Sequence, residues 1–318
     1  MSSKRRSAGA RRPVSGVAEA DLRVITGTTR VAAVVGRPVR HSLSPTILNA
    51  AFTAVGADWV YVAFEVPDGQ GAAAVGAMRT LGLGGLSVTM PHKAAVHDAV
   101  DERTPVAADL GAVNCVFRRR DRLVGDSTDG AGFIDALRLD EGVEVAGRRC
   151  VLVGAGGAGR AVARALGSAG AADVAVVNRS PVAAARAAAL AGAPGRVGTA
   201  ADAAGADLVV NATPLGMGAG RPAGTEPGAG RVAEPLPIDP AMLHAGQVVV
   251  DLIYHPEVTP LLAAARERGA LAVSGLGMLV HQAAHAFRRW TGDEAPLEVM
   301  RAATRHELAR RADSDGSP

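Results

Sequence analysis

Lys93 is the residue whose type and position most directly suggest chemistry. Of the 34 lysine and arginine residues, only Lys4 and Lys93 are lysines. Arginine stays protonated in proteins, whereas lysine can gain and lose a proton and so act as a general acid or base. Lys93 is therefore a candidate catalytic residue, and an ordinary surface lysine is the alternative interpretation.

Three groups of polar residues occur where predicted strands end and predicted helices begin. They are Ser42 with Ser44, Thr89 with Lys93, and Asn114 with Thr128 and Asp129. Ser42 and Ser44 could hold a carboxylate at a helix N-terminus, although such a pair is also an ordinary helix cap. Because ligands bind at the carboxyl ends of strands in open α/β sheets, these groups are expected to form a binding site.

A glycine-rich turn follows the apolar run CVLV and precedes a helical segment. Its pattern is Gly154-x-Gly156-x-x-Gly159. Glycines at this spacing permit a tight turn, close approach of a pyrophosphate and close packing of helix on strand. The segment predicts a dinucleotide site, with a nucleotide-free unit of the same fold as the alternative.

The end of the next predicted strand indicates which dinucleotide is bound. Proteins that bind NAD usually carry an Asp or Glu there, whereas this chain has Asn178 and Arg179. A carboxylate would repel a 2′-phosphate, and a guanidinium can pair with it. NADP is therefore favoured, with an ordinary exposed arginine as the alternative.

The elements that position these residues alternate between strand and helix, which predicts an α/β fold with largely parallel sheets. In the first region we expect strands at 31–36, 59–66, 84–90, 111–117 and 122–127. In the second we expect a strand–turn–helix–strand unit from Arg148, then strands at 206–214 and 247–254. A Gly/Pro-rich loop is predicted at 216–240, and helices from Leu276 to about Arg311.

Composition excludes several classes of protein. With 318 residues, 48% apolar and 20% charged, the chain is long enough for two domains and too apolar to be disordered throughout. No apolar run reaches the roughly 18 residues that span a bilayer, so we expect a soluble, cytoplasmic protein. An aromatic content of 3% gives no indication of nucleic-acid binding. Two cysteines allow neither a disulfide framework nor a cysteine-built zinc site, and no metal is expected.

Eight short motifs resemble those of the shikimate dehydrogenase family, and the resemblance covers nearly all of residues 31–300. The motifs are S-x-S-P at 42–45, V-T-x-P-x-K at 88–93, G-A-V-N at 111–114, T-D-G at 128–130, G-A-G-G-A at 154–158, N-R-[ST] at 178–180, N-A-T-P at 211–214 and G-L-G-M-L-V-x-Q-A at 275–283. The resemblance implies an NADP-dependent, reversible oxidation of shikimate to 3-dehydroshikimate. We expect a monomer or homodimer, and the sequence leaves that choice open.

The resemblance also implies roles for individual residues. Lys93 and Asp129 would form the acid–base pair. The substrate would be held by Ser42, Ser44, Thr89, Asn114, Tyr254 and Gln282, with the two serines and Tyr254 at its carboxylate. NADP would be held by Gly154, Ala155, Gly156, Gly157, Ala158, Asn178, Arg179 and Thr213, with Gly275 and Met278 near the nicotinamide.

The implied organisation is an N-terminal open α/β substrate domain and a C-terminal Rossmann NADP-binding domain, with the active site in the cleft between them. The substrate domain would span 22–131 and be completed by helices at 275–311, and the Rossmann domain would span 132–274. The basic stretch 1–21 and residues 312–318 are expected to be disordered tails, with a transit peptide as the alternative for the first.

Three departures from the family pattern leave alternatives open. Ser87 and Ser127 stand where family members often have Asn, and Ala183 stands where a second basic residue is often found. The shorter serines leave open a quinate or aminoshikimate dehydrogenase, and Ala183 leaves open a weaker preference for NADP. A catalytically silent, NADP-binding regulatory relative is a further alternative, although both Lys93 and Asp129 are present.

Overall fold

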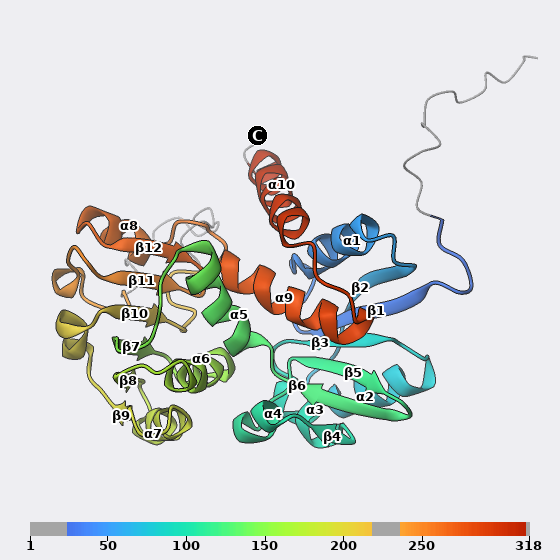
Figure 1. The fold of residues 1–318 in the computed structure, drawn as a ribbon, viewed down its shortest axis with the longest axis horizontal. Coiled ribbons are helices and arrows are strands. Elements are labelled where there is room, and N and C mark those ends of the chain that lie inside the picture. Colours follow the sequence, from blue (N-terminus) through green and yellow to red (C-terminus); the bar gives the residue numbers. More distant parts are fainter. Residues whose placement is uncertain (1–23, 218–235, 316–318) are drawn as a thin grey trace, which may run out of the picture.

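The computed structural model describes residues 24–217 and 236–315, and these residues form two six-stranded sheets (Figure 1). The predicted tail 1–21, most of the predicted loop 216–240 and the last three residues lie outside the described ranges. Among the described helices, none is long and apolar enough to cross a membrane.

The first sheet lies within residues 30–126 and is mixed. Its strands run in the order β2 (Trp59–Glu65), β1 (Arg30–Gly36), β3 (Gly85–Val88), β5 (Cys115–Arg119), β6 (Arg122–Asp126) and β4 (Glu102–Arg103). Strand β5 is antiparallel to both of its neighbours, and the other pairs are parallel. The parallel register of β1, β2 and β3 places the carboxyl ends of these three strands at one edge.

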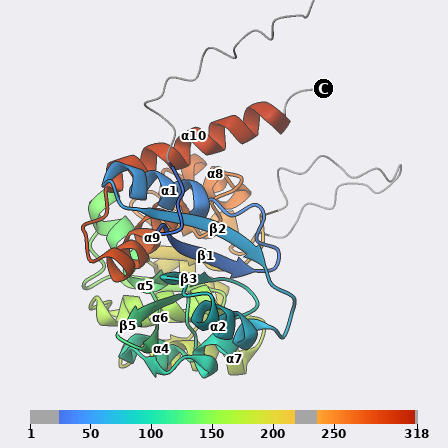
Figure 2. The same ribbon diagram turned by 90° about the vertical axis from the view of Figure 1, so that its right-hand side faces the viewer.

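Helices cover both faces of this sheet. Four helices come from the same part of the chain, namely α1 (Ser44–Ala54), α2 (Gly71–Thr80), α3 (Lys93–Ala99) and α4 (Pro105–Leu110). Two more, α9 (Leu276–Thr291) and α10 (Leu297–Asp315), come from the C-terminal end of the chain and pack with α1. Apolar side chains of α1 and α9 pack with Ala32 and Val34 on one face, and those of α2 and α3 pack with Ala33 and Val35 on the other. Helices α1 and α10 lie side by side above β1 and β2 (Figure 2).

The second sheet is entirely parallel. Its order is β9 (Gly195–Val197), β8 (Asp173–Val177), β7 (Arg149–Val153), β10 (Leu208–Asn211), β11 (Val248–Asp251) and β12 (Leu271–Ser274). In chain order this is 3-2-1-4-5-6, the doubly wound Rossmann arrangement. Its helices are α6 (Gly157–Ser168), α7 (Pro181–Leu190) and α8 (Pro260–Glu267), with short 3₁₀-helices η3 (Ala200–Gly205) and η4 (Pro240–Met242). The two sheets confirm the predicted α/β fold.

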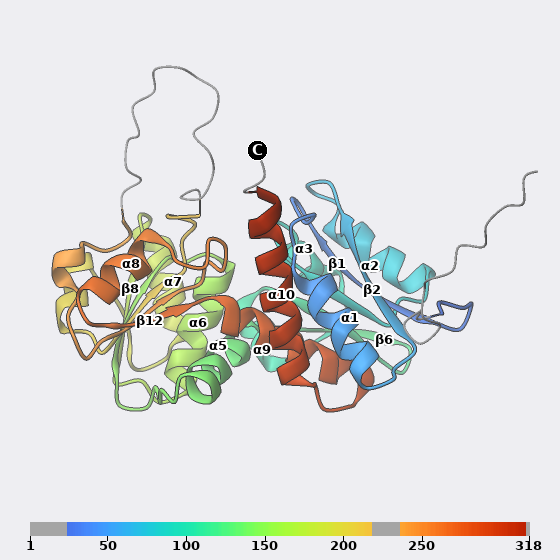
Figure 3. The same cartoon turned by 90° about the horizontal axis from the view of Figure 1, so that it is seen from above.

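Helix α5 (Asp129–Asp135), continued by the π-helix η2 (Ala136–Asp140), joins the two halves. A Cβ atom at Gly130 would lie 2.8 Å from the Ala161 carbonyl oxygen of α6, and one at Gly132 would lie 2.5 Å from the Gln282 nitrogen of α9. Two glycines thus allow α5 to pack tightly on both helices, and α9 runs from one half into the other (Figure 3). The boundary expected after residue 131 falls inside α5.

The structure differs from the predicted elements in several places, and β4, α4, β9, α8 and β12 are elements that were not predicted. Helix α2 was not predicted, although Gly71, Val75 and Met78 are buried at helical spacing. The N-cap of α1 is Leu43 and not Ser44. The disordered tail expected at 312–318 is wrong for residues 312–315, because α10 continues to Asp315, and residues 316–318 lie outside the described ranges. Arg311, in the last turns of α10, donates to Glu307 and to the His41 carbonyl.

Candidate active site

Lys93 and Asp129 form an ion pair although 36 residues separate them in the chain. The Lys93 Nζ donates to Asp129 Oδ2 at 2.6 Å. Lys93 is the first residue of α3, and Asp129 is the first residue of α5. Their side chains are only 21% and 11% exposed, so the pair is largely withdrawn from water.

Asn114 and Thr128 hold the Asp129 carboxylate in place. Asn114 Nδ2 donates to Asp129 Oδ1 at 2.7 Å, so a different partner occupies each carboxylate oxygen. The Asn114 Oδ1 accepts from the Thr128 backbone N–H at 2.8 Å, which fixes the orientation of the amide. Thr128 is therefore part of this network, and its place in the T-D-G motif was the sequence signal for it.

The serine and threonine groups lie at the strand ends of the same domain. Ser42 Oγ accepts from the Ser44 N–H at 3.2 Å, and the Ser44 side chain is buried at the start of α1. Thr89 directly follows β3, and its N–H donates to the Val35 carbonyl of β1 at 2.9 Å. Because β1 and β3 are neighbours, both groups occur at one edge of the sheet.

Tyr254 and Gln282 reach this domain from later parts of the chain. Tyr254 follows β11, yet its ring packs against the apolar cluster between the first sheet and helices α1 and α9. Burial raises the pKa of its phenol, and the Arg311 charge opposes that shift. Gln282 lies on α9 and donates to the Leu279 carbonyl at 2.8 Å.

The glycine turn has the geometry of a dinucleotide-binding loop. Gly154 has φ of +106°, and a Cβ there would lie 2.8 Å from the Ala212 carbonyl oxygen. A Cβ at Gly159 would lie 2.1 Å from the Gly154 carbonyl oxygen, so helix α6 packs directly on the turn. At Gly156 no atom lies within 4 Å of the Cβ position. The turn therefore exposes backbone at its centre.

Asn178, Arg179 and Thr213 lie beside this turn. Asn178 Oδ1 accepts from the Ala155 N–H at 3.3 Å, which ties the end of β8 to the glycine loop. Arg179 is exposed at the same strand end. Thr213 follows β10, where its hydroxyl donates to Asn211 Oδ1 at 2.7 Å.

A buried carboxylate that was not predicted, Asp251, holds Asn211, which in turn accepts a hydrogen bond from Thr213. Asp251 is fully buried; its Oδ1 accepts from Asn211 Nδ2 at 3.0 Å, and its Oδ2 accepts from the Thr259 hydroxyl at 2.7 Å. Burial raises the pKa of this carboxyl, and the hydrogen bonds oppose the shift. An Asp at the end of the apolar run VVVD was the available sequence signal.

The glycine turn and the ion pair approach each other across the two domains. A Cβ placed on Gly157 would lie 3.8 Å from Lys93 Cδ. Met278 and Gln282 share one face of α9, because residues four positions apart lie on the same side of a helix, and Gly275 is the N-cap residue before it. Met278 packs against the Rossmann core, while Gly275 N–H donates to the Ile253 carbonyl at 3.2 Å. The structure thus brings predicted substrate and cofactor residues together.

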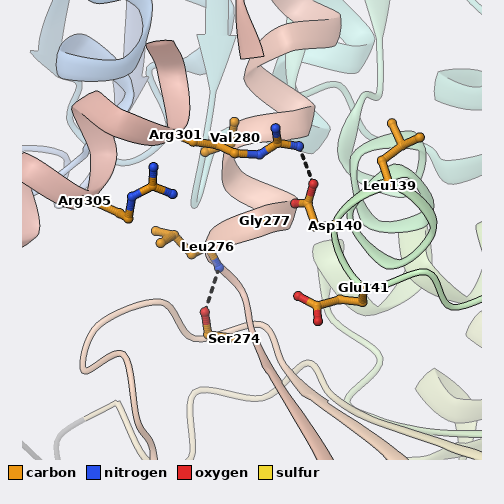
Figure 4. Close-up of a pocket in the computed structure, with 9 residues that line it drawn as sticks. All are labelled: Leu139, Asp140, Glu141, Ser274, Leu276, Gly277, Val280, Arg301 and Arg305. Atoms are coloured by element: carbon orange, nitrogen blue, oxygen red, sulfur yellow. Dashed lines mark hydrogen bonds and ion pairs between the residues drawn. The ribbon is translucent and has the colours of Figure 1, made fainter. Parts of the chain in front are cut away.

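A pocket of about 420 Å³ lies beside the first turns of α9 (Figure 4). It is lined by Leu139, Asp140, Glu141, Ser274, Leu276, Gly277, Val280, Arg301 and Arg305. Arg301 and the buried His281 both contact Asp140 there, which links α10 and α9 to η2. None of the predicted site residues lines this pocket.

Comparisons with known proteins place this geometry in a family. The family models described as shikimate dehydrogenase substrate binding domain and shikimate 5′-dehydrogenase C-terminal domain match residues 34–116 and 275–305. A shikimate dehydrogenase (NADP(+)) from Moorella thermoacetica is 43% identical over 304 residues, or 92% of this chain and 98% of the relative.

Solved structures agree with the sequence comparison. A crystal structure of a shikimate dehydrogenase in complex with NADP⁺ has a TM-score of 0.79 and 34% identity, covering 90% of this chain and 98% of the other. The Thermus thermophilus shikimate 5-dehydrogenase, in complex with NADP(H) and shikimate, has a TM-score of 0.76 and 34% identity over 87% of this chain and 99% of the other.

Proposed function

Because this chain belongs to the shikimate dehydrogenase family, we propose that it catalyses the reversible, NADP-dependent oxidation of shikimate to 3-dehydroshikimate, with Lys93 and Asp129 as its acid–base pair. The observation that carries the catalytic assignment is the 2.6 Å contact between Lys93 Nζ and Asp129 Oδ2, beside the glycine turn. At this ion pair, the predicted substrate site and the predicted NADP site approach each other.

The proton chemistry follows from this pair. In the direction of reduction, the Lys93 ammonium gives a proton to the oxygen that becomes the alcohol; in oxidation, the neutral amine removes the hydroxyl proton. Asp129 orients Lys93 and can share the proton with it across the 2.6 Å contact. Asn114 keeps the second carboxylate oxygen occupied, which leaves Oδ2 directed at Lys93.

The residues of the Rossmann domain fit NADP. The open space above Gly156 and the N-terminus of α6 suit a pyrophosphate, and exposed Arg179 would pair with the 2′-phosphate. Ala155, Gly157, Ala158, Asn178 and Thr213 would complete the binding site, with Gly275 and Met278 beside the nicotinamide. When bound, NADP supplies the site that accepts or gives the hydride.

The residues of the first domain fit shikimate, a cyclic hydroxy acid, as the substrate. Ser42, Ser44 and Tyr254 would hold its carboxylate, while Thr89, Asn114, Asp129 and Gln282 would hold its ring hydroxyls. Ser87 and Ser127 keep a hydroxyl where relatives often have an amide, so quinate and amino-substituted substrates are the alternatives. Relative kcat/KM values on the three acids distinguish them.

We also propose that the protein acts in the cytoplasm as a monomer or homodimer and binds no nucleic acid. Cys115 and Cys150 are unpaired and buried, which suits a reducing compartment. Size-exclusion chromatography coupled to light scattering measures the oligomeric state directly.

Turnover of wild type and Lys93→Ala tests the assignment. We expect wild type to reduce NADP⁺ with shikimate faster than with quinate or with NAD⁺, and Lys93→Ala to lower kcat by roughly 100-fold or more. NADP⁺ affinity, measured by calorimetry, should change less than about twofold. Asp98→Ala, on the exposed side of the same helix, is the matched control and should retain activity. Unchanged kcat in Lys93→Ala would contradict the catalytic role.

A further inference from the structure

Helix α6 of the Rossmann domain carries two arginines whose side chains reach into the substrate domain. Arg160 Nη1 donates to the Leu110 carbonyl at 3.0 Å, and Arg164 Nε donates to Asp109 Oδ2 at 2.9 Å. Leu110 and Asp109 are the last two residues of α4, and they lie 50 and 55 positions from their partners in the chain. The two arginines therefore join the NADP-binding half of the molecule to the substrate half.

The two bonds differ in what they hold. Arg164 and Asp109 form an ion pair between side chains that are 24% and 53% exposed, so water and salt screen their attraction. Arg160 instead bonds the main chain of buried Leu110, in the last turn of α4, where helix carbonyls have no partner within the helix. A guanidinium bond to such an oxygen is charge-assisted, and it fixes the backbone itself. Buried Ala161 packs in one apolar cluster with Leu110 at this contact.

The segment that Arg160 holds leads directly to the candidate acid–base pair. Leu110 immediately precedes the G-A-V-N motif. Within that motif, the Val113 N–H donates to the Lys93 carbonyl at 3.0 Å, and the Asn114 amide donates to the Asp129 carboxylate at 2.7 Å. One short stretch of chain is thus bonded to α6 at its start and to both members of the pair at its end.

On its own domain, Arg160 lies in the first turn of α6, directly after the glycine turn. Its backbone N–H donates to the Gly156 carbonyl at 2.9 Å. A Cβ atom on Gly157, at the start of the same helical turn, would lie 3.8 Å from Lys93 Cδ. Arg160 therefore links the two domains at the place where the glycine turn and the ion pair come closest to each other.

We propose that Arg160 is a positioning residue that holds the two halves of the site at the separation that hydride transfer requires. A displacement of about 1 Å between reacting groups can slow a reaction about 100-fold. In the proposed assignment each ligand is held by its own half of the molecule, so binding of either ligand does not depend on Arg160, whereas the transfer step does. The inference rests on the proposed function of Lys93 and Asp129.

Single-turnover reduction of NADP⁺ by Arg160→Gln, at saturating shikimate, tests the inference. Glutamine is shorter and uncharged, so the bond to the Leu110 carbonyl is lost. We expect the rate constant of the absorbance change to fall about tenfold with its amplitude unchanged. The Kd of each ligand alone, measured by calorimetry, should change less than about twofold. A merely structural role would lower the amplitude, because fewer molecules are folded, and would leave the rate constant of the others unchanged.

Arg164→Gln is the matched control. It removes the same charge from the same helix, one turn further on, and breaks a contact with the same end of α4, but it leaves the Leu110 carbonyl bonded. The single-turnover rate constant of this variant should change less than about twofold. Arg160→Lys keeps a cationic donor at the first position and should recover the rate to within about threefold of wild type.

The outcomes that overturn the inference differ from the one that refutes the proposed function. A wild-type rate constant in Arg160→Gln would overturn the inference, as would an equal decrease in Arg164→Gln, which would show that any cationic contact between α6 and α4 has this effect. A large loss of NADP⁺ affinity in Arg160→Gln would also overturn it, because Arg160 would then belong to the cofactor site. A wild type that does not turn over shikimate would refute the proposed function, and the inference with it.

Discussion

The two halves of the candidate site are built by different means. In the substrate domain, charged and polar side chains carry the geometry: Lys93, Asp129 and Asn114 form a continuous network over 2.6–2.7 Å contacts. In the Rossmann domain, the shape of the turn depends on glycines, which have no side chain. At Gly154 and Gly159 a Cβ atom would lie within 2.8 Å of a backbone oxygen.

This difference reflects what each half must do. A proton can be moved only by a titratable group, so the substrate domain needs particular side chains at particular distances. A pyrophosphate is held by backbone N–H groups and a helix N-terminus, so the Rossmann domain needs close approach of the backbone. Substitutions should therefore act on chemistry in one half and on packing or cofactor affinity in the other.

The largest effect that tests this comparison is expected at Gly159. A methyl group 2.1 Å from the Gly154 carbonyl oxygen must displace α6 from the turn. We expect Gly159→Ala to lower the free energy of unfolding by about 1–3 kcal/mol or more and to weaken NADP⁺ binding. Urea unfolding and calorimetry measure the two effects.

Gly156→Ala is its counterpart, because the Cβ position there meets no atom within 4 Å. The free energy of unfolding should change by less than about 0.5 kcal/mol, whereas NADP⁺ affinity should fall roughly tenfold where the methyl group obstructs the pyrophosphate. Equal losses of stability in both variants would remove the distinction between a packing glycine and a binding glycine.

An intermediate effect is expected from the one charged side chain assigned to the cofactor. Arg179→Gln should lower the preference for NADP⁺ over NAD⁺ in kcat/KM by about tenfold, because a charge-assisted bond to the 2′-phosphate is lost. Stability should not change, since Arg179 is exposed. In wild type the preference should also fall as salt rises, which screens exposed charges. A preference that Arg179→Gln leaves intact would assign 2′-phosphate recognition to another group.

The smallest effect is expected at Glu307 of α10, which holds Arg311 beside His41, the residue before Ser42. Arg310 and Arg311 lower the pKa of Glu307 to about 2, and Arg311 Nη1 donates to the His41 carbonyl at 2.8 Å. Glu307→Gln should release Arg311 and raise the shikimate KM about twofold. Arg310→Gln, which leaves the contact with His41, is the control and should not raise it.

The pH dependence of this contact has a definite sign. A carboxyl whose pKa is lower in the folded state stabilises it above the ordinary pKa of about 4.5, and that contribution is lost as the pH falls toward 2. Faster amide hydrogen exchange at the end of α10 is therefore expected below about pH 4.5. Exchange that is identical at pH 3 and pH 7, after correction for intrinsic rates, would contradict this role.

Much of the architecture could be predicted because it depends on residues that are close together in the sequence. The glycine turn, the strands around it and Arg179 follow one another within 32 residues, Arg148 to Arg179, so their arrangement depends on a single strand–turn–helix–strand unit. Helix α2 could not be predicted in the same way, since its small residues GAAAVGA give little periodic contrast. The last turns of α10 contact distant His41 through Arg311, which the local pattern does not indicate.

The sequence by itself determined the fold class and the family, because strand–helix alternation and eight ordered motifs are properties of neighbouring residues. The tertiary structure decided which of those residues meet. Lys93 and Asp129 form an ion pair only because α3 and α5 start at adjoining places in the fold, and Gly157 lies near Lys93 only because α5 packs on both α6 and α9.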